Sequence, residues 1–124
     1  MEKKDTGDRG EELAAAYLLQ KGYQILERNW RFKHLEIDII AQQGDFIVIV
    51  EVKTRATREF GEPASFVNQK KKSHLIKAAN FYAIEKNLQN EFRFDIVSVF
   101  VFGREAEIDH YEEAFYPLVN QIKI

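Results

Sequence analysis

The apolar residues of the chain recur at two spacings, one typical of helices and one typical of strands. Residues 9–21 place Leu and Ala at helical spacing, and Gly22 predicts the end of that helix. A second helix is predicted over residues 64–87, with one buried stripe made of Val67, Lys71, Leu75, Ala78, Ala79 and Tyr82. The rest of the chain is rich in β-forming residues.

Five extended segments predict strands, which cover residues 23–32, 35–42, 46–54, 92–102 and 106–111. A two-residue turn at Gly44-Asp45 joins the second and third strands into a hairpin, with Gln43 opposite Phe46. Residues 55–63 predict a loop. The order α-β-β-β-α-β-β indicates a single α/β domain over all 124 residues, in which helices flank a mixed sheet.

Charged residues interrupt the apolar hairpin at one place. Residues 46–52 are apolar except for Glu51, and Lys53 follows on the same face of the strand. The predicted register sets Asp38 opposite Glu51, and Glu36 opposite Lys53, with Cβ atoms of opposed residues about 5 Å apart. Glu36 is either a salt-bridge partner of Lys53 or turned outward by the twist of the sheet. Two carboxylates this close repel each other unless a cation lies between them or one of them is protonated. The pattern therefore predicts a divalent-metal site with an ammonium group beside it.

Each of these residues also has a purely structural interpretation. The end of a strand can leave its charges solvated and paired across the hairpin, but two acids and a lysine on one face favour a site. Lys71 lies on the sheet-facing side of the second helix, where it either reaches the site or extends past the sheet edge. Glu11 has capping-box spacing with Asp8, and periodicity alone favours a structural role for it.

Composition narrows the classes of function. The net charge of −2 and the pI near 5.9 argue against a generic duplex-binding protein, although basic residues cluster at 28–34, 53–58 and 70–72. The lack of cysteine excludes disulfides and thiolate metal sites, and the three histidines show no spacing typical of a triad or a zinc site. No apolar run has the length of a membrane span, and no signal peptide is visible, so we expect a cytoplasmic protein.

The motif formed by Asp38 and Glu51-Val52-Lys53 resembles the PD-(D/E)xK signature of restriction-endonuclease-like nucleases. More narrowly, the chain resembles the YraN-type family of small bacterial proteins, which are related to archaeal Holliday-junction resolvases. The matching pieces follow one another from the first helix to the fourth strand: Gly10-Glu11, Gly22-Tyr23, Asn29-Trp30-Arg31, Glu36-Ile-Asp38, Gly44-Asp45, residues 50–55, Phe60-Gly61, Lys71 and Arg93-Phe-Asp95. One departure is Leu35, which stands where the family usually has Gly.

This resemblance implies a restriction-endonuclease-like core and metal-dependent hydrolysis of DNA, including branched or recombination intermediates. Asp38, Glu51 and the carbonyl of Val52 would bind Mg²⁺ or Mn²⁺. Lys53 would orient the attacking water, Lys71 would contact the phosphate, and Glu11 would hold the metal or its waters from the outer shell. Resolvases that cut junctions symmetrically act as dimers, so a homodimer is also implied.

Two other classes of protein are compatible with the sequence. The first is a nuclease-fold module that binds nucleic acid without cutting it. The second is an interaction or scaffold protein, in which Asp38, Glu51 and Lys53 form only a buried polar network.

Overall fold

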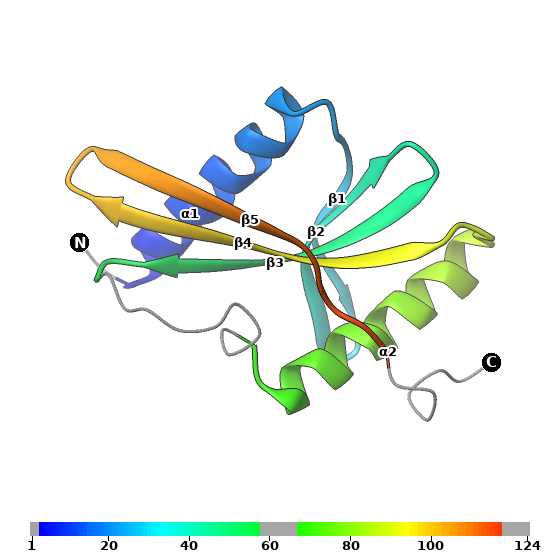
Figure 1. Cartoon of the computed structure of the whole chain (residues 1–124). Helices are drawn as coiled ribbons and strands as arrows, with labels where there is room; N and C mark the ends of the chain where they lie inside the picture. The colour runs from blue at the N-terminus through cyan, green and yellow to red at the C-terminus, as the bar shows by residue number, and fades with distance from the viewer. Residues whose placement is uncertain (1–2, 58–66, 118–124) are drawn as a thin grey trace.

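The computed structural model describes residues 3–57 and 67–117, with side chains from residue 7 onward. In these residues the elements are α1 (Lys3–Gln20), β1 (Gln24–Phe32), β2 (Leu35–Gln43), β3 (Phe46–Arg55), α2 (Gln69–Lys86), β4 (Phe92–Phe102) and β5 (Glu105–Phe115), as Figure 1 shows. The strands form a mixed sheet in the order β1-β2-β3-β4-β5. Only β3 and β4 run parallel among the paired strands of the described part, because α2 connects them as a crossover. The predicted order is confirmed, and it agrees with a restriction-endonuclease-like core.

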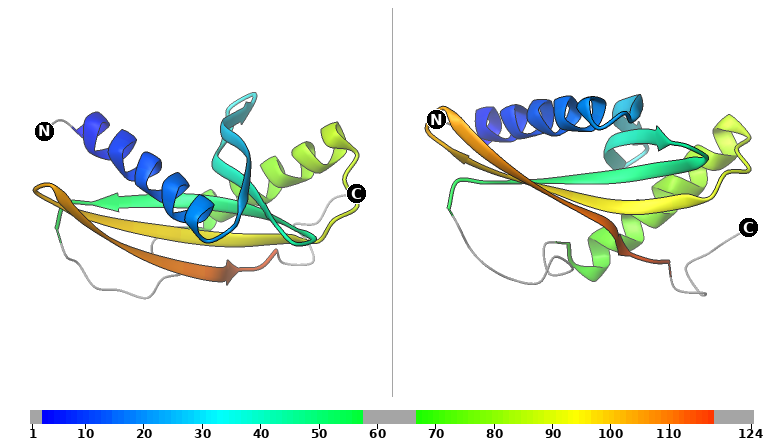
Figure 2. Two further views of the ribbon diagram at one scale, coloured as in Figure 1. Left: turned by 90° about the horizontal axis from the view of Figure 1, so that it is seen from above. Right: turned by 45° about the horizontal axis from the view of Figure 1, so that its top comes forward.

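The two helices cover opposite faces of this sheet, as the right-hand view of Figure 2 makes clear. One core layer contains Leu18 of α1 with Val48, Val50, Val97 and other residues of the strands. The second layer contains Leu75 and Tyr82 of α2 with residues of β2, β3 and β4. Because both faces are covered, the central strands are apolar on both sides, and this explains their near-continuous apolar runs.

The first helix is longer than its sequence predicts. It begins at Lys3, not at residue 9, so Asp8 lies inside the helix and cannot cap its amino terminus. The capping-box interpretation of Asp8 and Glu11 is therefore wrong. The predicted end is confirmed: Gly22 adopts φ +91°, and the amide of Tyr23 donates to the carbonyl of Leu18 at 2.9 Å, which is a Schellman cap.

Two other boundaries differ from the predictions. The second helix starts at Gln69 because the side chain of Asn68 accepts a hydrogen bond from the Lys71 amide at 2.8 Å and caps the helix. Residues 64–66, where the start was predicted, lie outside the described residues, as does most of the predicted 55–63 loop. The last strand extends to Phe115, four residues beyond the prediction. In the described part of the chain, neither helix is long and apolar enough to cross a membrane.

Candidate active site

The predicted hairpin register is confirmed at its turn, where Gln43 pairs with Phe46 and Gly44 has φ +57°. The ladder between β2 and β3 runs only as far as the pair Ile39 and Val50. Beyond this pair the two strands diverge, and in Figure 1 the β1–β2 hairpin and the end of β3 point in different directions. The divergence opens a gap in the sheet where backbone groups need other partners.

Asp38 occupies this gap. Its Oδ2 accepts a hydrogen bond from the amide of Val52 at 2.9 Å, in place of a backbone carbonyl of β2. The amide and the carbonyl of a strand residue point to the same side of the strand. The Val52 carbonyl therefore faces the same gap as the Asp38 carboxylate. This is the orientation that the predicted third metal ligand requires.

Glu51 lies next to Asp38 in an environment that opposes its ionisation. Its side chain is only 14% exposed, and burial together with the charge of Asp38 raises its pKa to about 8. Burial also raises the pKa of Asp38, although the Val52 amide and the charge of Lys71 act in the opposite direction. Among the described residues, Glu51 Oε1 is buried without a hydrogen-bond partner. The two carboxyl groups hydrogen-bond to each other, and the charges of Lys71 and Lys53 offset only part of the effect of burial on Glu51.

The charges of the two predicted lysines, Lys71 and Lys53, both act on Glu51. Lys71 Nζ is 3.8 Å from Glu51 Oε2, which confirms that this residue faces the sheet. Lys53 is exposed on β3, and its charge lowers the pKa of Glu51. Together they make the surroundings of the carboxylates favourable for an anionic phosphate.

Glu11 reaches the site because α1 approaches β3 very closely. A Cβ atom on Gly10 would lie 1.9 Å from Thr54 Oγ1, so only glycine allows this approach. Glu11 is half-buried, and its pKa is raised by burial and then by the charge of Asp38. The structure thus places Asp38, Glu51 and Lys71 next to one another. Lys53 and Glu11 are near enough for charges to act between them and these carboxylates.

Glu36 lies at the edge of this group, and its charge raises the pKa of both Asp38 and Glu11. It lies opposite Arg31 on β1, and its Oε2 accepts from Arg31 Nε at 2.9 Å. The predicted pairing with Lys53 is absent from the described ladder because β2 and β3 have already diverged. Glu36 is therefore an ion-pair partner of the neighbouring strand.

The residues present fit a hard divalent cation. No group of three or more His, Asp or Glu in the described part of the chain is close enough to form a complete protein cage. Mg²⁺ and Mn²⁺ do not require one, because they retain several waters and bind through one or two carboxylates. The Glu51 oxygen that lacks a partner within the described residues, the facing Asp38 and the Val52 carbonyl are a donor set of this kind.

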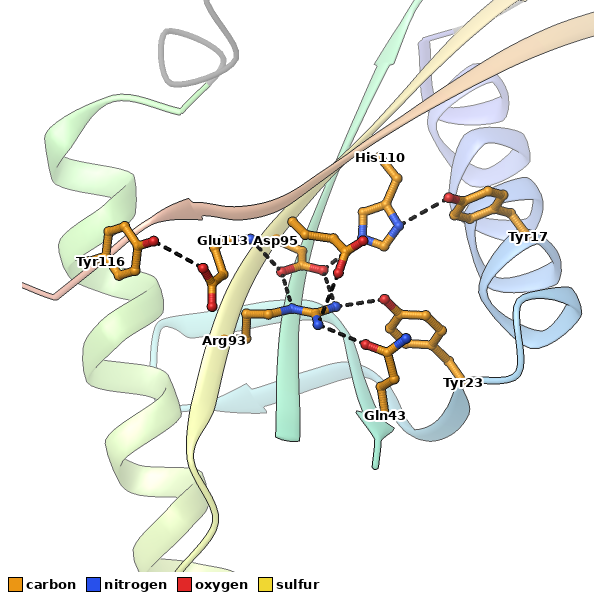
Figure 3. A network of polar contacts seen from close by, with 9 residues as sticks. Tyr17, Tyr23, Gln43, Arg93, Asp95, His110, Glu113 and Tyr116 are labelled. Carbon is orange, nitrogen blue, oxygen red and sulfur yellow. Dashed lines mark hydrogen bonds and ion pairs between the residues drawn. The ribbon is translucent and has the colours of Figure 1, made fainter. Parts of the chain in front are cut away.

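A second buried polar cluster was not predicted from the sequence. Arg93 and Asp95 lie in β4, are 7% and 0% exposed, and form a bidentate ion pair at 2.8–2.9 Å. His110 Nε2 is 2.7 Å from Asp95 Oδ2, and its Nδ1 is 3.1 Å from the hydroxyl of Tyr17. Arg93 also contacts Tyr23 and Gln43, as Figure 3 shows, and it forms a further ion pair with Glu112. We call these residues the Arg93 network.

The charges of the Arg93 network compensate each other. Burial alone would raise the pKa of Asp95, but hydrogen bonds from His110 and Arg93 hold it below its ordinary value. Burial would lower the pKa of Arg93, and the contacts with Asp95 raise it instead. The sequence contains one signal for this network, which is the pair of charged residues Arg93 and Asp95 at alternate positions of an otherwise apolar strand. The network ties β4 and β5 to α1, which indicates a structural role.

Comparison with known proteins shows a family match over most of this chain. The family described as "Uncharacterised protein family UPF0102" matches residues 10–99, which include every residue of the site. A UPF0102 protein of Flavobacterium psychrophilum is 50% identical over 115 residues, covering 93% of this chain and 97% of that protein. Another, from Clostridioides difficile, is 46% identical over 116 residues and is matched over its whole length.

Proposed function

Since the chain belongs to the UPF0102 (YraN) family, and the family match extends across the whole candidate site, we propose that it is a metal-dependent nuclease that hydrolyses phosphodiester bonds in DNA. The observation that carries this proposal is the Glu51 carboxylate, which is buried beside Asp38 with one oxygen lacking a partner among the residues that the structure describes. A group of this kind is costly to keep in a folded protein, and a bound cation removes the cost.

In this proposal Asp38, Glu51 and the carbonyl of Val52 hold Mg²⁺ or Mn²⁺. The ion supplies two things when bound: a water with a lowered pKa and polarisation of the scissile phosphate. Lys53 orients the attacking water and offsets the negative charge that develops on the phosphate. Lys71 contacts a phosphate oxygen, and Glu11 accepts hydrogen bonds from waters around the ion.

A comparison within the molecule argues against a purely structural role for this cluster. The Arg93 network pairs its buried acid with Arg93 and His110 at hydrogen-bond distance. The ion pair between Glu51 and Lys71, at 3.8 Å, is longer than a hydrogen bond. Buried networks that only stabilise a fold satisfy their members. The cluster around Glu51 is therefore better explained as a site that is completed by a ligand.

The test is a Mn²⁺-dependent cleavage assay on linear, flapped and four-way DNA. Glu51→Gln keeps the shape of the side chain and removes its charge, so cleavage should fall at least about 100-fold. Glu105→Gln, an exposed carboxylate in the β4–β5 turn region, is the matched control and should cleave like the wild type. Equal residual cleavage by wild type and Glu51→Gln would contradict the proposal.

A further inference from the structure

A second surface feature lies farther along α2, away from the carboxylates. The tip of the β1–β2 hairpin and the second half of α2 form a hollow of about 440 Å³. We call it the aromatic patch and define it by six side chains: Phe32, Lys33, His34, Lys77, Phe81 and Ile84. The largest apolar side chains here remain open to solvent, with Phe81 39% and Ile84 72% exposed.

The aromatic rings of this patch are already stacked. Trp30 and Phe32 are nearly parallel, at 8° with ring centroids 6.3 Å apart. Phe81 stacks on Phe32 at 25° and 4.4 Å, and its own ring is partly exposed. A partly exposed ring at the end of a stack is a surface on which another flat ring can be added.

Positive charge surrounds these rings. Lys33 Nζ lies 5.6 Å from the Phe32 ring centroid, and Lys77 also lines the hollow. The pKa of His74 is lowered by slight burial and then by the charges of His34, Lys70, Lys71 and Lys77. The basic residues near this side of α2 therefore lie close enough to act on His74 electrostatically.

Two acids lie near this patch. Glu36 is paired with Arg31, whereas Glu85 lies one helical turn after Phe81 and offsets one of the lysine charges. The patch therefore combines apolar rings with an excess of positive charge.

The patch continues from the candidate active site along one side of α2. Lys70, His74, Lys77, Phe81 and Ile84 recur every three or four residues and thus form one stripe of the helix. Lys71, next to the start of this stripe, contacts Glu51. From Lys71 to Phe81 the helix rises about 15 Å, which corresponds to four or five stacked bases at about 3.4 Å each.

We propose that the aromatic patch binds unpaired bases of the DNA substrate, with one base stacked on Phe81 and with Lys33 and Lys77 contacting the flanking phosphates. The inference rests on the proposed nuclease function and deepens it, because it selects DNA with a single-stranded segment near the cleaved bond. Aromatic rings interleaved with lysines are typical of surfaces that bind single strands. The cores of protein–protein interfaces, by contrast, are depleted of lysine.

Binding is tested without cleavage, in the Glu51→Gln protein with EDTA and a fluorescently labelled 12-nucleotide single strand. Phe81→Ala should weaken binding about 10-fold, since stacking of one base contributes about 1–3 kcal/mol. Lys77→Ala should reduce the slope of log K against log salt by about 0.7. Phe102→Ala is the matched control: its ring is 38% exposed, at the far end of β4, and its loss should leave the affinity unchanged.

Three outcomes would overturn the inference. One is equal binding by the Phe81→Ala and Phe102→Ala proteins, both checked for folding by circular dichroism. A second is equal affinity for the single strand and for a blunt duplex of the same length. The third is a concentration-dependent dimer that Phe81→Ala dissociates, because the patch would then bind a second copy. The proposed nuclease function has a separate test, because it fails if the wild-type protein does not cleave DNA.

Discussion

At the scale of single residues, Glu51 is the group whose surroundings oppose its charge most clearly. Its pKa of about 8 lies above the ordinary value of 4.5, so the folded protein holds a proton that the unfolded chain releases. Below pH 4.5 both states carry the proton and the effect vanishes. As the pH rises from 4.5 toward 8, the free energy of unfolding falls. Without metal, Glu51 thus destabilises the fold at neutral pH.

We therefore expect Glu51→Gln to stabilise the metal-free protein at pH 7.5 by about 2 kcal/mol, since each unit of pKa shift corresponds to about 1.4 kcal/mol and the coupling to Asp38 reduces the full effect. The measurement is urea unfolding in EDTA. Mn²⁺ at 100 times its dissociation constant should stabilise the wild type by about 2.7 kcal/mol. The Glu51→Gln protein should not respond to Mn²⁺. A variant that is less stable than the wild type in EDTA would show that Glu51 holds the fold together.

Lys33 carries backbone strain at the tip of the β1–β2 hairpin. Its φ of +58° lies in the left-handed region, which a glycine adopts without steric cost. Lys33→Gly should therefore leave stability unchanged or raise it by up to about 1 kcal/mol, the strain relief being partly offset by the flexibility of glycine when unfolded. The same variant should weaken binding of the labelled single strand. Chemical denaturation and fluorescence anisotropy on one preparation measure both effects, and unchanged binding would remove Lys33 from the proposed surface.

At the scale of the elements, the contact between α1 and β3 depends on the absence of a side chain at Gly10. An added Cβ would overlap Thr54, so Gly10→Ala must push α1 away from the sheet and move Glu11 with it. We expect a loss of about 1–3 kcal/mol, the range for overpacked sites.

Gly7, in the same helix, is the control, because no atom lies within 4 Å of the point that an added Cβ would occupy. Gly7→Ala should instead stabilise the protein by about 1 kcal/mol through helix propensity. Thermal unfolding of both variants checks the pair of predictions. Stabilisation by both substitutions would mean that α1 does not pack this closely on β3.

The sequence predicted the elements wherever a periodic pattern or a cap was present. The β2–β3 hairpin was placed in the correct register because a two-residue turn allows one alignment. The start of α1 was missed because residues 3–8 are polar and include Gly7, so no apolar stripe marks them. The end of β5 was missed for a similar reason, since Glu112 and Glu113 are exposed and interrupt the alternation.

The candidate site likewise contains some relations that the sequence predicts and others that it does not. The same-face relation of Glu51 and Lys53, and their proximity to Asp38, follow from strand geometry and a short turn. The approach of Glu11 does not, because it depends on how α1 docks against a strand more than 40 residues later in the chain. The hairpin register set Glu36 opposite Lys53 and left its role open. The structure pairs it with Arg31 instead, because the divergence of β2 from β3 is a property of the whole sheet.

At the scale of the whole molecule, the Arg93 network joins parts of the chain that are far apart in sequence. Arg93 donates to the Tyr23 hydroxyl across 70 positions, and Tyr17 meets His110 across 93. No local pattern predicts such contacts. The network belongs to the face of the sheet covered by α1, where Asp95 lies beside Val50 in the strand register. The network therefore lies beside β3 at Val50, the residue immediately before Glu51.

This position leads to a prediction about acid stability. The folded-state pKa of Asp95 is lowered below its ordinary value of 3.8, so its charge stabilises the fold at every pH above that value. The contribution is lost as the pH falls below about 4 and through the folded pKa. Asp95→Asn should destabilise the protein by about 3 kcal/mol at pH 7, because Arg93 and His110 lose a buried partner.

The difference between the wild type and Asp95→Asn should be constant from pH 5 to 7 and should shrink below pH 4. Urea unfolding across this range measures it. Asp109→Asn, an exposed neighbour of His110 on β5, should remain within about 0.5 kcal/mol of the wild type throughout. A difference for Asp95→Asn that grows in acid would mean that burial outweighs the hydrogen bonds from His110 and Arg93, and that the carboxyl group is held protonated. Asp95 and Glu51 lie in adjacent strands, but Asp95 has a cation at hydrogen-bond distance and Glu51 does not. The contribution of Asp95 to stability should therefore rise with pH, whereas that of Glu51 should fall with pH.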